Sequence, residues 1–179
     1  TRTTDVWRPC DAVEPGVSWK AAILGQHGPS VLVFSRQNLP HQPRSDEQVK
    51  LIERGGYVLA DAEGGTPDVI LMGTGSEVSL AVEAKKVLDA AGLKTRVVSL
   101  PSTDVFHRQD PAYRESVLPK AVRKRVAVEA GITDFWRKYV GLDGAVVGLD
   151  RFGASAPAGD LYKYFGITTE AVVEAAKAL

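Results

Sequence analysis

The feature that most constrains the fold is the alternation, from Tyr57 onward, of short apolar runs with longer helix-like segments. The expected strands are Tyr57–Ala60, Val69–Gly73, Thr95–Leu100, Arg125–Glu129 and Ala145–Leu149. The expected helices are Ser76–Ala91, Pro111–Ser116, Asp134–Val140, Pro157–Phe165 and Thr169–Ala178. Strands that are joined through helices pair in parallel, with right-handed crossovers. Residues 57–179 therefore predict an α/β fold, a three-layer α/β/α domain with a five-stranded, mostly parallel sheet.

The first expected strand is an exception to this parallel pairing. The link Asp61–Pro67 is short, and its two glycines and its proline are typical of turns. A short link of this kind favours a hairpin, whereas a parallel connection needs a longer crossover. We therefore expect Tyr57–Ala60 to be antiparallel to the rest of the sheet.

Residues 1–40 predict a helix and a strand that lack a sheet of their own. Asp11 and Glu14 form a capping-box pattern, which starts a helix that runs to about Leu24. The apolar run Ser30–Phe34 is typical of a strand buried on both faces of a parallel sheet. One helix and one strand cannot form a core, so this orphan pair requires a sheet from elsewhere.

A change in composition separates these two parts of the sequence. Residues 40–47 are rich in proline and polar side chains, and a short helix is expected over Glu47–Arg54, before Gly55. We therefore predict a linker over residues 41–56, between a segment of residues 1–40 and a domain of residues 57–179. The sequence begins with Thr1 and not with Met, so we expect a fragment of a longer protein.

Composition excludes several classes of function. The 22 basic and 22 acidic residues cancel, so no net positive charge exists to hold nucleic acid or an anionic membrane surface. No apolar run reaches the length of about 18 residues that a transmembrane helix needs. Cys10 is the single cysteine, which fits a reducing, cytoplasmic compartment. We expect no nucleic-acid partner and no membrane partner.

Arg36 is the strongest candidate for binding a ligand. It follows directly on the apolar run Ser30–Phe34, within the turn Ser35–Asn38. Ligands of open parallel sheets bind beyond the carboxyl ends of the strands. A guanidinium at that position suits the bidentate geometry of a phosphate group. The alternative is that Arg36 forms a structural salt bridge at the end of the strand.

The turn Gly73–Glu77 is a weaker candidate, because it joins an expected strand to an expected helix. Backbone N–H groups at such a junction can face an anion. The pattern is nevertheless neither a complete dinucleotide fingerprint nor a P-loop. Thr74 and Glu77 also fit a capping box. We favour capping and keep a regulatory ligand as a minor hypothesis.

The remaining polar residues form no complete catalytic set. His27, His41 and His107 lack the short spacing of metal ligands. Arg123–Arg125 is interpreted as a solvated edge, because the net charge is zero. Aromatic residues within 135–139 and 162–165 are expected in a core or an interface. We therefore assign no catalytic, cofactor-binding or metal-binding residue within this sequence.

Short motifs along nearly the whole sequence resemble those of bacterial transketolases. They are Trp7–Asp11, Ser35–Leu39, Arg54–Tyr57, Gly73–Val78, Pro101–Asp104, Tyr113–Pro119, Val128–Gly131 and Phe152–Pro157. The resemblance implies that residues 1–40 are the end of a pyrimidine-binding domain, that residues 41–56 are a linker, and that residues 57–179 are the complete C-terminal domain.

The resemblance also implies an activity for the longer protein. Transketolases transfer a two-carbon ketol unit from a ketose phosphate to an aldose phosphate in the pentose phosphate pathway. They are expected to be cytoplasmic homodimers that use thiamine diphosphate and Mg²⁺ or another divalent cation. The family's catalytic glutamate and diphosphate-binding motif are absent from this sequence. We therefore expect the isolated fragment to bind no cofactor and to be inactive.

One substrate contact carries over from the family. The arginine of its Ser-Arg-Gln motif binds the sugar phosphate, and Arg36 occupies that place. The partners implied are sugar phosphates, the rest of the transketolase chain and the second subunit of a homodimer. Two alternatives stay open: a non-catalytic interaction or regulatory module, and a parent of the dihydroxyacetone synthase type, which uses formaldehyde as the acceptor.

Overall fold

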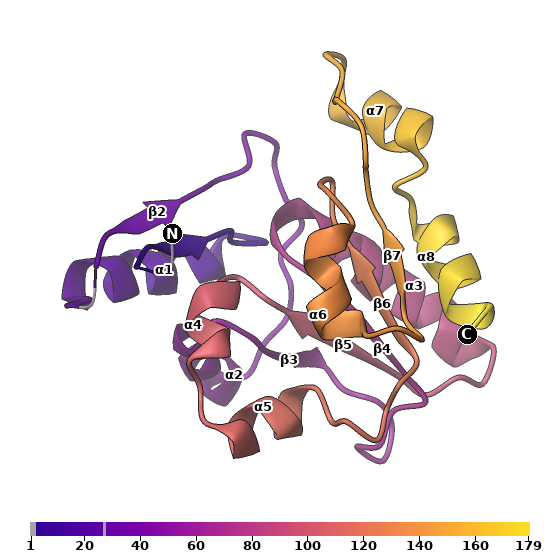
Figure 1. Cartoon of the computed structure of the whole chain (residues 1–179), viewed down its shortest axis with the longest axis horizontal. Coiled ribbons are helices and arrows are strands. Elements are labelled where there is room, and N and C mark those ends of the chain that lie inside the picture. The colour runs from indigo at the N-terminus through magenta and orange to yellow at the C-terminus, as the bar shows by residue number, and fades with distance from the viewer. Residues whose placement is uncertain (1–2, 27) are drawn as a thin grey trace.

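The computed structural model describes residues 3–26 and 28–179 (Figure 1). Its strands are β1 (Asp5–Trp7), β2 (Ser30–Leu32), β3 (Tyr57–Ala60), β4 (Val69–Gly73), β5 (Thr95–Ser99), β6 (Arg125–Val128) and β7 (Ala145–Val147). Its α-helices are α1 (Val13–Leu24), α2 (Asp46–Leu51), α3 (Val78–Ala90), α4 (Thr103–His107), α5 (Pro111–Val117), α6 (Arg137–Val140), α7 (Ala158–Phe165) and α8 (Thr169–Lys177). Short 3₁₀ helices are η1 (Ile52–Arg54), η2 (Gly75–Glu77) and η3 (Asp134–Trp136).

The main sheet has five strands in the order β3-β5-β4-β6-β7. The pairs β4–β5, β4–β6 and β6–β7 are parallel, whereas β3 is antiparallel to β5. This arrangement confirms the predicted five-stranded, mostly parallel sheet with an antiparallel first strand. The predicted hairpin is wrong, because β3 pairs with β5 and not with β4.

The path of the link after β3 explains why no hairpin forms. Arg96 on β5 donates hydrogen bonds to both carboxylate oxygens of Asp61, at 2.7 and 3.0 Å. The same guanidinium donates to the carbonyl oxygen of Gly65 at 3.0 Å. The link is therefore fastened to β5, which leaves β4 to enter the sheet on the far side of that strand.

Two cores form on opposite faces of the sheet, because successive side chains of a strand point to opposite sides. Val69 and Leu71 of β4 pack with the buried residues of α3 and α8. Ile70 and Met72 pack with Phe106 and the other buried side chains of α4, α5 and α6. All four β4 side chains are fully buried. These layers, which can be followed in Figure 1, confirm the three-layer architecture.

The N-terminal segment contains one more strand than expected. β1 pairs in parallel with β2, in the register Asp5↔Ser30 to Trp7↔Leu32. The prediction of a strand buried on both faces is wrong for this chain, because Val31, Val33 and Phe34 are 45–47% exposed. Their exposure follows from the size of the sheet, since β1 and β2 form a two-stranded sheet with few neighbours.

The segment that joins the two sheets is ordered by local capping. Ser45 and Gln48 form a capping box at the start of α2, which continues into η1. The helix ends at Gly55, whose φ of 78° is left-handed, as expected for a helix over Glu47–Arg54. Among the described residues, no helix is both long enough and apolar enough to cross a membrane. The division into residues 1–40, 41–56 and 57–179 stays a prediction.

Candidate functional site

Arg36 lies in the turn that follows β2, on an irregular stretch that ends at the capping box of α2. Its side chain is exposed. It forms no ion pair with the residues that the structure describes. The alternative interpretation of a structural salt bridge is therefore not supported. The Arg36 guanidinium is available to bind an anion, and its role in binding a substrate stays a prediction.

A cavity of about 420 Å³ lies between this turn and the start of α1. Ser35, Gln37 and Asn38 line it from the side of the turn, and Pro9 and Ala12 are among the residues on the other side. Hydroxyl and amide side chains both donate and accept hydrogen bonds, so they suit a ligand with several hydroxyl groups. The turn thus combines a free positive charge with a polar cavity wall.

Both ends of the irregular stretch are held in place. At its start, the Val33 amide donates to the Trp7 carbonyl oxygen at 2.8 Å. At its end, the Gln42 amide donates to the Asp11 carboxylate at 3.0 Å, and the Arg44 guanidinium donates to the same carboxylate at 2.5 Å. The side chains of Asp11 and Arg44 are 0% and 1% exposed. Burial alone would raise the pKa of Asp11, but hydrogen bonds from Arg44 and Gln42 lower it below its ordinary value.

Glu14 connects this anchor to the main sheet. Its buried carboxylate accepts hydrogen bonds from the Cys10 amide at 2.7 Å, the Tyr57 hydroxyl at 2.9 Å and the Ser99 hydroxyl at 2.7 Å. Asp11 does accept from the Glu14 amide at 3.3 Å, but Glu14 does not complete the predicted capping box. Burial, followed by the charge of Glu14, raises the pKa of the Tyr57 hydroxyl. The Glu14 carboxylate is therefore a structural acceptor that joins α1 to β3 and β5.

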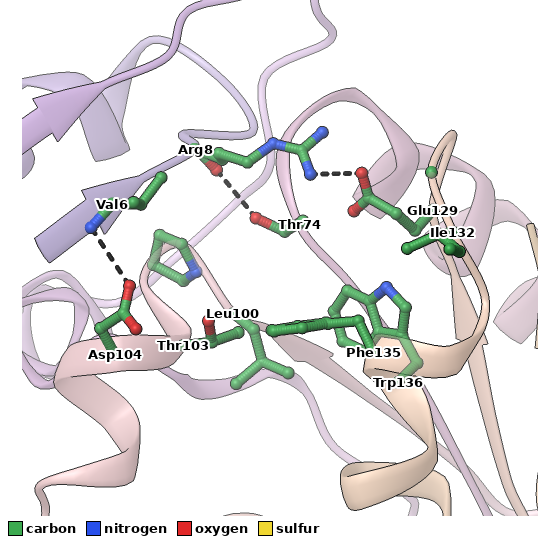
Figure 2. A pocket seen from close by; sticks show the side chains of 12 residues that line it. Val6, Arg8, Thr74, Leu100, Thr103, Asp104, Glu129, Ile132, Phe135 and Trp136 are labelled. Carbon is green, nitrogen blue, oxygen red and sulfur yellow. Dashed lines mark hydrogen bonds and ion pairs between the residues drawn. The ribbon is translucent and has the colours of Figure 1, made fainter. Parts of the chain in front are cut away.

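A second cavity, of about 380 Å³, lies at the carboxyl ends of β4, β5 and β6 (Figure 2). Arg8 enters this edge from the N-terminal segment. Its guanidinium binds Glu129 and lies 4.0 Å from the Glu77 carboxylate. Its amide donates to the Pro101 carbonyl oxygen at 2.7 Å, and its carbonyl oxygen accepts from the Gly75 amide at 3.0 Å. The chain's own Arg8 thus fills the place where ligands of open parallel sheets usually bind.

The turn Gly73–Glu77 is a contact for this segment and not a capping box. The Thr74 hydroxyl donates to the Arg8 carbonyl oxygen at 3.2 Å and makes no capping hydrogen bond. Glu77 is 1% exposed, and its carboxylate accepts from the Tyr162 hydroxyl at 2.7 Å. Since the Gly75 amide is occupied and a buried carboxylate lies beside it, the turn is unfavourable for an anion.

Glu129 is the acidic group at this edge whose protonation is most affected by its surroundings. Its pKa is raised to about 7. Burial is the main cause and the charge of Glu77 adds to it, whereas the charge and the hydrogen bond of Arg8 act in the opposite direction. The sequence does not point to Glu129, because nothing in the run Val126–Glu129 indicates that the carboxylates of Glu77 and Glu129 both lie beside the Arg8 guanidinium.

The other candidate residues are separated in space. His27 lies outside the described residues. His41 is exposed, with its Nδ1 atom 3.6 Å from Asp11, and His107 is exposed at the end of α4. In the described part of the chain, no group of three or more His, Cys, Asp or Glu side chains is arranged to hold a metal ion.

The interpretation of Arg123–Arg125 as a solvated edge is correct at one end and wrong at the other. Arg123 is exposed and pairs with Asp143. Arg125 is partly buried and donates to backbone carbonyl oxygens, including that of Tyr139 at 2.8 Å. Of the aromatic residues, Trp136 is buried in the core and Tyr164 is 67% exposed.

Residues 55–168 match the model of a family described as the transketolase-like TK C-terminal domain. The whole chain is 59% identical to Transketolase 1 of Vibrio cholerae, and 98% of it aligns at 58% identity with Transketolase 1 of Pasteurella multocida. It covers 27% and 26% of those proteins, so the chain spans about a quarter of the length of the curated relatives it matches.

Solved structures that superpose on this chain are also transketolases. Transketolase from Leishmania mexicana superposes with a TM-score of 0.87 at 42% identity, over 98% of this chain and 26% of that one. Transketolase from Pichia stipitis in complex with sedoheptulose 7-phosphate superposes with a TM-score of 0.88 at 43% identity, over 98% of this chain and 25% of that one. From its sequence and its fold, the chain belongs to the transketolase family and contains the C-terminal domain of that family.

Proposed function

We propose that this chain is the C-terminal part of a transketolase, which transfers a two-carbon ketol unit from a ketose phosphate to an aldose phosphate. The observation that carries the proposal is the exposed Arg36 side chain, which has no ion-pair partner among the described residues and whose neighbours Ser35 and Gln37 line a cavity. The Pichia stipitis relative, solved in complex with sedoheptulose 7-phosphate, supports a sugar phosphate as the ligand.

In this proposal, Arg36 binds the phosphate group of the sugar. A guanidinium stays protonated at physiological pH and offers two parallel N–H donors to phosphate oxygens. Ser35, Gln37 and Asn38 bind hydroxyl groups of the sugar chain from the cavity wall. The phosphate group lies remote from the reacting carbons, so Arg36 holds and orients the substrate and takes no part in proton transfer.

The cofactor belongs to another part of the longer protein. Thiamine diphosphate supplies the carbanion chemistry of the reaction when it is bound. The described residues do not fit a diphosphate-bound metal, because they contain no cluster of three potential His, Cys, Asp or Glu ligands. We therefore assign thiamine diphosphate, Mg²⁺ or another divalent cation, and the catalytic residues to the remainder of the enzyme. We expect the isolated chain to be inactive and the enzyme to act in the pentose phosphate pathway in the cytoplasm.

An exposed apolar face supports the proposed protein partners. Trp19, Ile23, Val33 and Phe34 on or after α1 and β2 are 46–74% exposed. The ring centres of Trp19 and Phe34 lie 6.4 Å apart, and exposed apolar side chains of this kind favour packing against another domain or subunit. We propose that the rest of the transketolase chain and the second subunit of a homodimer provide that packing. This contact role is compatible with catalysis by the complete enzyme.

The experiment is ketol transfer by the full-length enzyme from xylulose 5-phosphate to ribose 5-phosphate, in the wild type and in Arg36→Ala. Loss of a charged contact to phosphate costs on the order of 1.5–3 kcal/mol, which is about tenfold to a hundredfold in apparent affinity. We expect KM for the phosphorylated donor to rise by that factor, with a smaller change in kcat.

Two controls define the result. Arg123→Ala removes an exposed arginine that pairs with Asp143, and it should leave KM unchanged. A donor without a phosphate group should lose little from Arg36→Ala. Unchanged KM for the phosphorylated donor would remove Arg36 from the site but keep the enzyme. Formaldehyde as the preferred acceptor would identify the dihydroxyacetone synthase alternative, and no turnover at all would favour a non-catalytic module.

A further inference from the structure

A cavity of about 450 Å³ lies on the face of the sheet that α4, α5 and α6 cover, at the amino end of β6. Its lining includes four positively charged side chains and one negatively charged side chain, which leaves an excess of three positive charges. The charged residues are Arg114, Lys120, Arg125, Lys138 and Glu115. The chain as a whole has no net charge, so this cavity concentrates one sign of charge.

Arg125 brings a positive charge to the cavity wall, and no carboxylate among the described residues forms an ion pair with it. Its guanidinium donates four hydrogen bonds of 2.8–3.1 Å, all to neutral backbone carbonyl oxygens. The acceptors belong to Leu118, Pro119, Val122 and Tyr139. Burial lowers the pKa of Arg125, and the charge of Glu115 acts in the opposite direction. Since arginine stays protonated in proteins, the positive charge of Arg125 is fixed in place.

Arg114 supplies a donor that lacks an acceptor. Its Nε atom is buried and has no hydrogen-bond partner among the described residues. Tyr139 lines the same cavity and is 7% exposed, but its hydroxyl interacts with the Thr103 side chain and so does not count as a free donor. Buried donors are normally satisfied, so the Arg114 donor at this cavity indicates a missing acceptor.

The other charged side chains that line the cavity do not accept a hydrogen bond from Arg114. The Lys138 ammonium lies 4.0 Å from the ring centre of Phe135 and 5.0 Å from that of Tyr139, and it forms no ion pair with the described residues. One Glu115 carboxylate oxygen already accepts from the Lys120 amide at 2.8 Å. The cavity therefore offers unused donors and uncompensated positive charge, which together fit an anion.

We propose that this cavity binds a phosphorylated small molecule, with Arg114 donating to the phosphoryl oxygens and with Arg125 and Lys138 providing fixed positive charge. A guanidinium can pair with two phosphate oxygens at once. The excess of three positive charges suits a phosphate group, which carries more negative charge than a single carboxylate. The volume of 450 Å³ lies within the range of about 300–1,000 Å³ that is typical of small-molecule sites. The site is distinct from Arg36, because its lining comes entirely from residues 106–139.

Calorimetric titration of the full-length protein, loaded with thiamine diphosphate and Mg²⁺, tests the proposal. The background variant is Arg36→Ala, so that the proposed substrate site contributes little. The probes are inorganic phosphate and adenosine 5′-monophosphate, which distinguish free phosphate from a phosphate ester. We expect one saturable site for at least one probe. Arg114→Gln should weaken it about tenfold to a hundredfold, as expected for loss of one charged contact.

Two further variants make the result specific. Lys138→Gln removes a second charge from the cavity without removing a hydrogen bond of the fold, and it should weaken the same site. Arg123→Gln is the matched control, because it removes an exposed arginine on the same segment that does not line the cavity. The proposal is overturned if neither probe binds in the Arg36→Ala background, if Arg114→Gln leaves binding unchanged, or if Arg123→Gln weakens binding as much as Arg114→Gln does.

Discussion

Replacing Arg44 by methionine tests whether buried charge fastens the N-terminal segment to the sheet. The Arg44 side chain is 1% exposed, and its guanidinium donates to Asp11 at 2.5 Å and to the Tyr57 hydroxyl at 2.6 Å. It also lies 3.6 Å from Glu14. Methionine keeps an apolar stem but removes the positive charge of Arg44. Among the described residues, no other side chain forms ion pairs with both Asp11 and Glu14. Removing one partner of a buried ion pair costs about 3–5 kcal/mol, and we expect that loss in the free energy of unfolding.

The pH dependence separates lost charge from lost packing. In the wild type, the pKa of Asp11 is below its ordinary value of 3.8, so its contribution to stability is present above that pH and is lost as the pH falls further. Without the hydrogen bond and the charge of Arg44, we expect burial to raise the pKa of Asp11 relative to the wild type. The carboxyl group then protonates as the pH falls and no longer needs a cation. The difference between wild type and Arg44→Met should therefore be largest near pH 7 and should shrink toward pH 4.

Urea denaturation of the 179-residue chain, followed by circular dichroism at pH 7 and pH 4, measures this difference. Arg123→Met is the control, because Arg123 is an exposed arginine paired with Asp143, and surface pairs contribute about 0–1 kcal/mol. A loss below about 1 kcal/mol at pH 7, or an equal loss at both pH values, would show that the reasoning about Asp11 and Glu14 is wrong.

Two other parts of the fold give sharp predictions. The pKa of Glu129 is about 7 in the folded state, against an ordinary value of 4.5, so between these two pH values the folded state holds a proton that the unfolded state has lost. The free energy of unfolding should therefore fall by about 1.4 kcal/mol per pH unit over this range. Glu129→Gln should remove that slope from urea midpoints measured at several pH values. Gly55→Ala should cost about 2–5 kcal/mol, because φ is 78° and a Cβ atom would lie 2.4 Å from the Ser102 carbonyl oxygen. Gly64→Ala, at φ 77° with open space around it, should cost only about 1–2 kcal/mol in the same unfolding experiment.

The strands of the main sheet could be predicted from the sequence because each is rich in apolar or β-branched residues. Their pairing order could not be predicted in full, because it depends on contacts between distant residues. The hydrogen bonds from Arg96 to Asp61, 35 residues apart, place the link after β3 across β5. A short link rich in glycine gives no sign of such a contact, so the hairpin was the natural expectation.

The candidate site shows the same limit. Arg36 could be found because position after a strand and residue type both point to an anion. The Asp11–Arg44 ion pair could not be predicted, because charged residues in a proline-rich stretch are usually exposed to solvent. In this structure both side chains are buried. The Arg114 cavity was equally hidden, since its walls come from three helices, the loop after α5 and the first residue of β6.

The N-terminal segment is held at two different places on the sheet, and together they fix the turn that carries Arg36. Glu14 bonds to Tyr57 of β3 and Ser99 of β5, which orients α1 against that edge. Arg8 bonds to the ends of β4 and β6, which orients β1. The irregular stretch around Arg36 starts at a hydrogen bond to β1 and ends at one to Asp11, just before α1. The position of Arg36 is therefore set by the main sheet, although no residue of that sheet lines the cavity beside it.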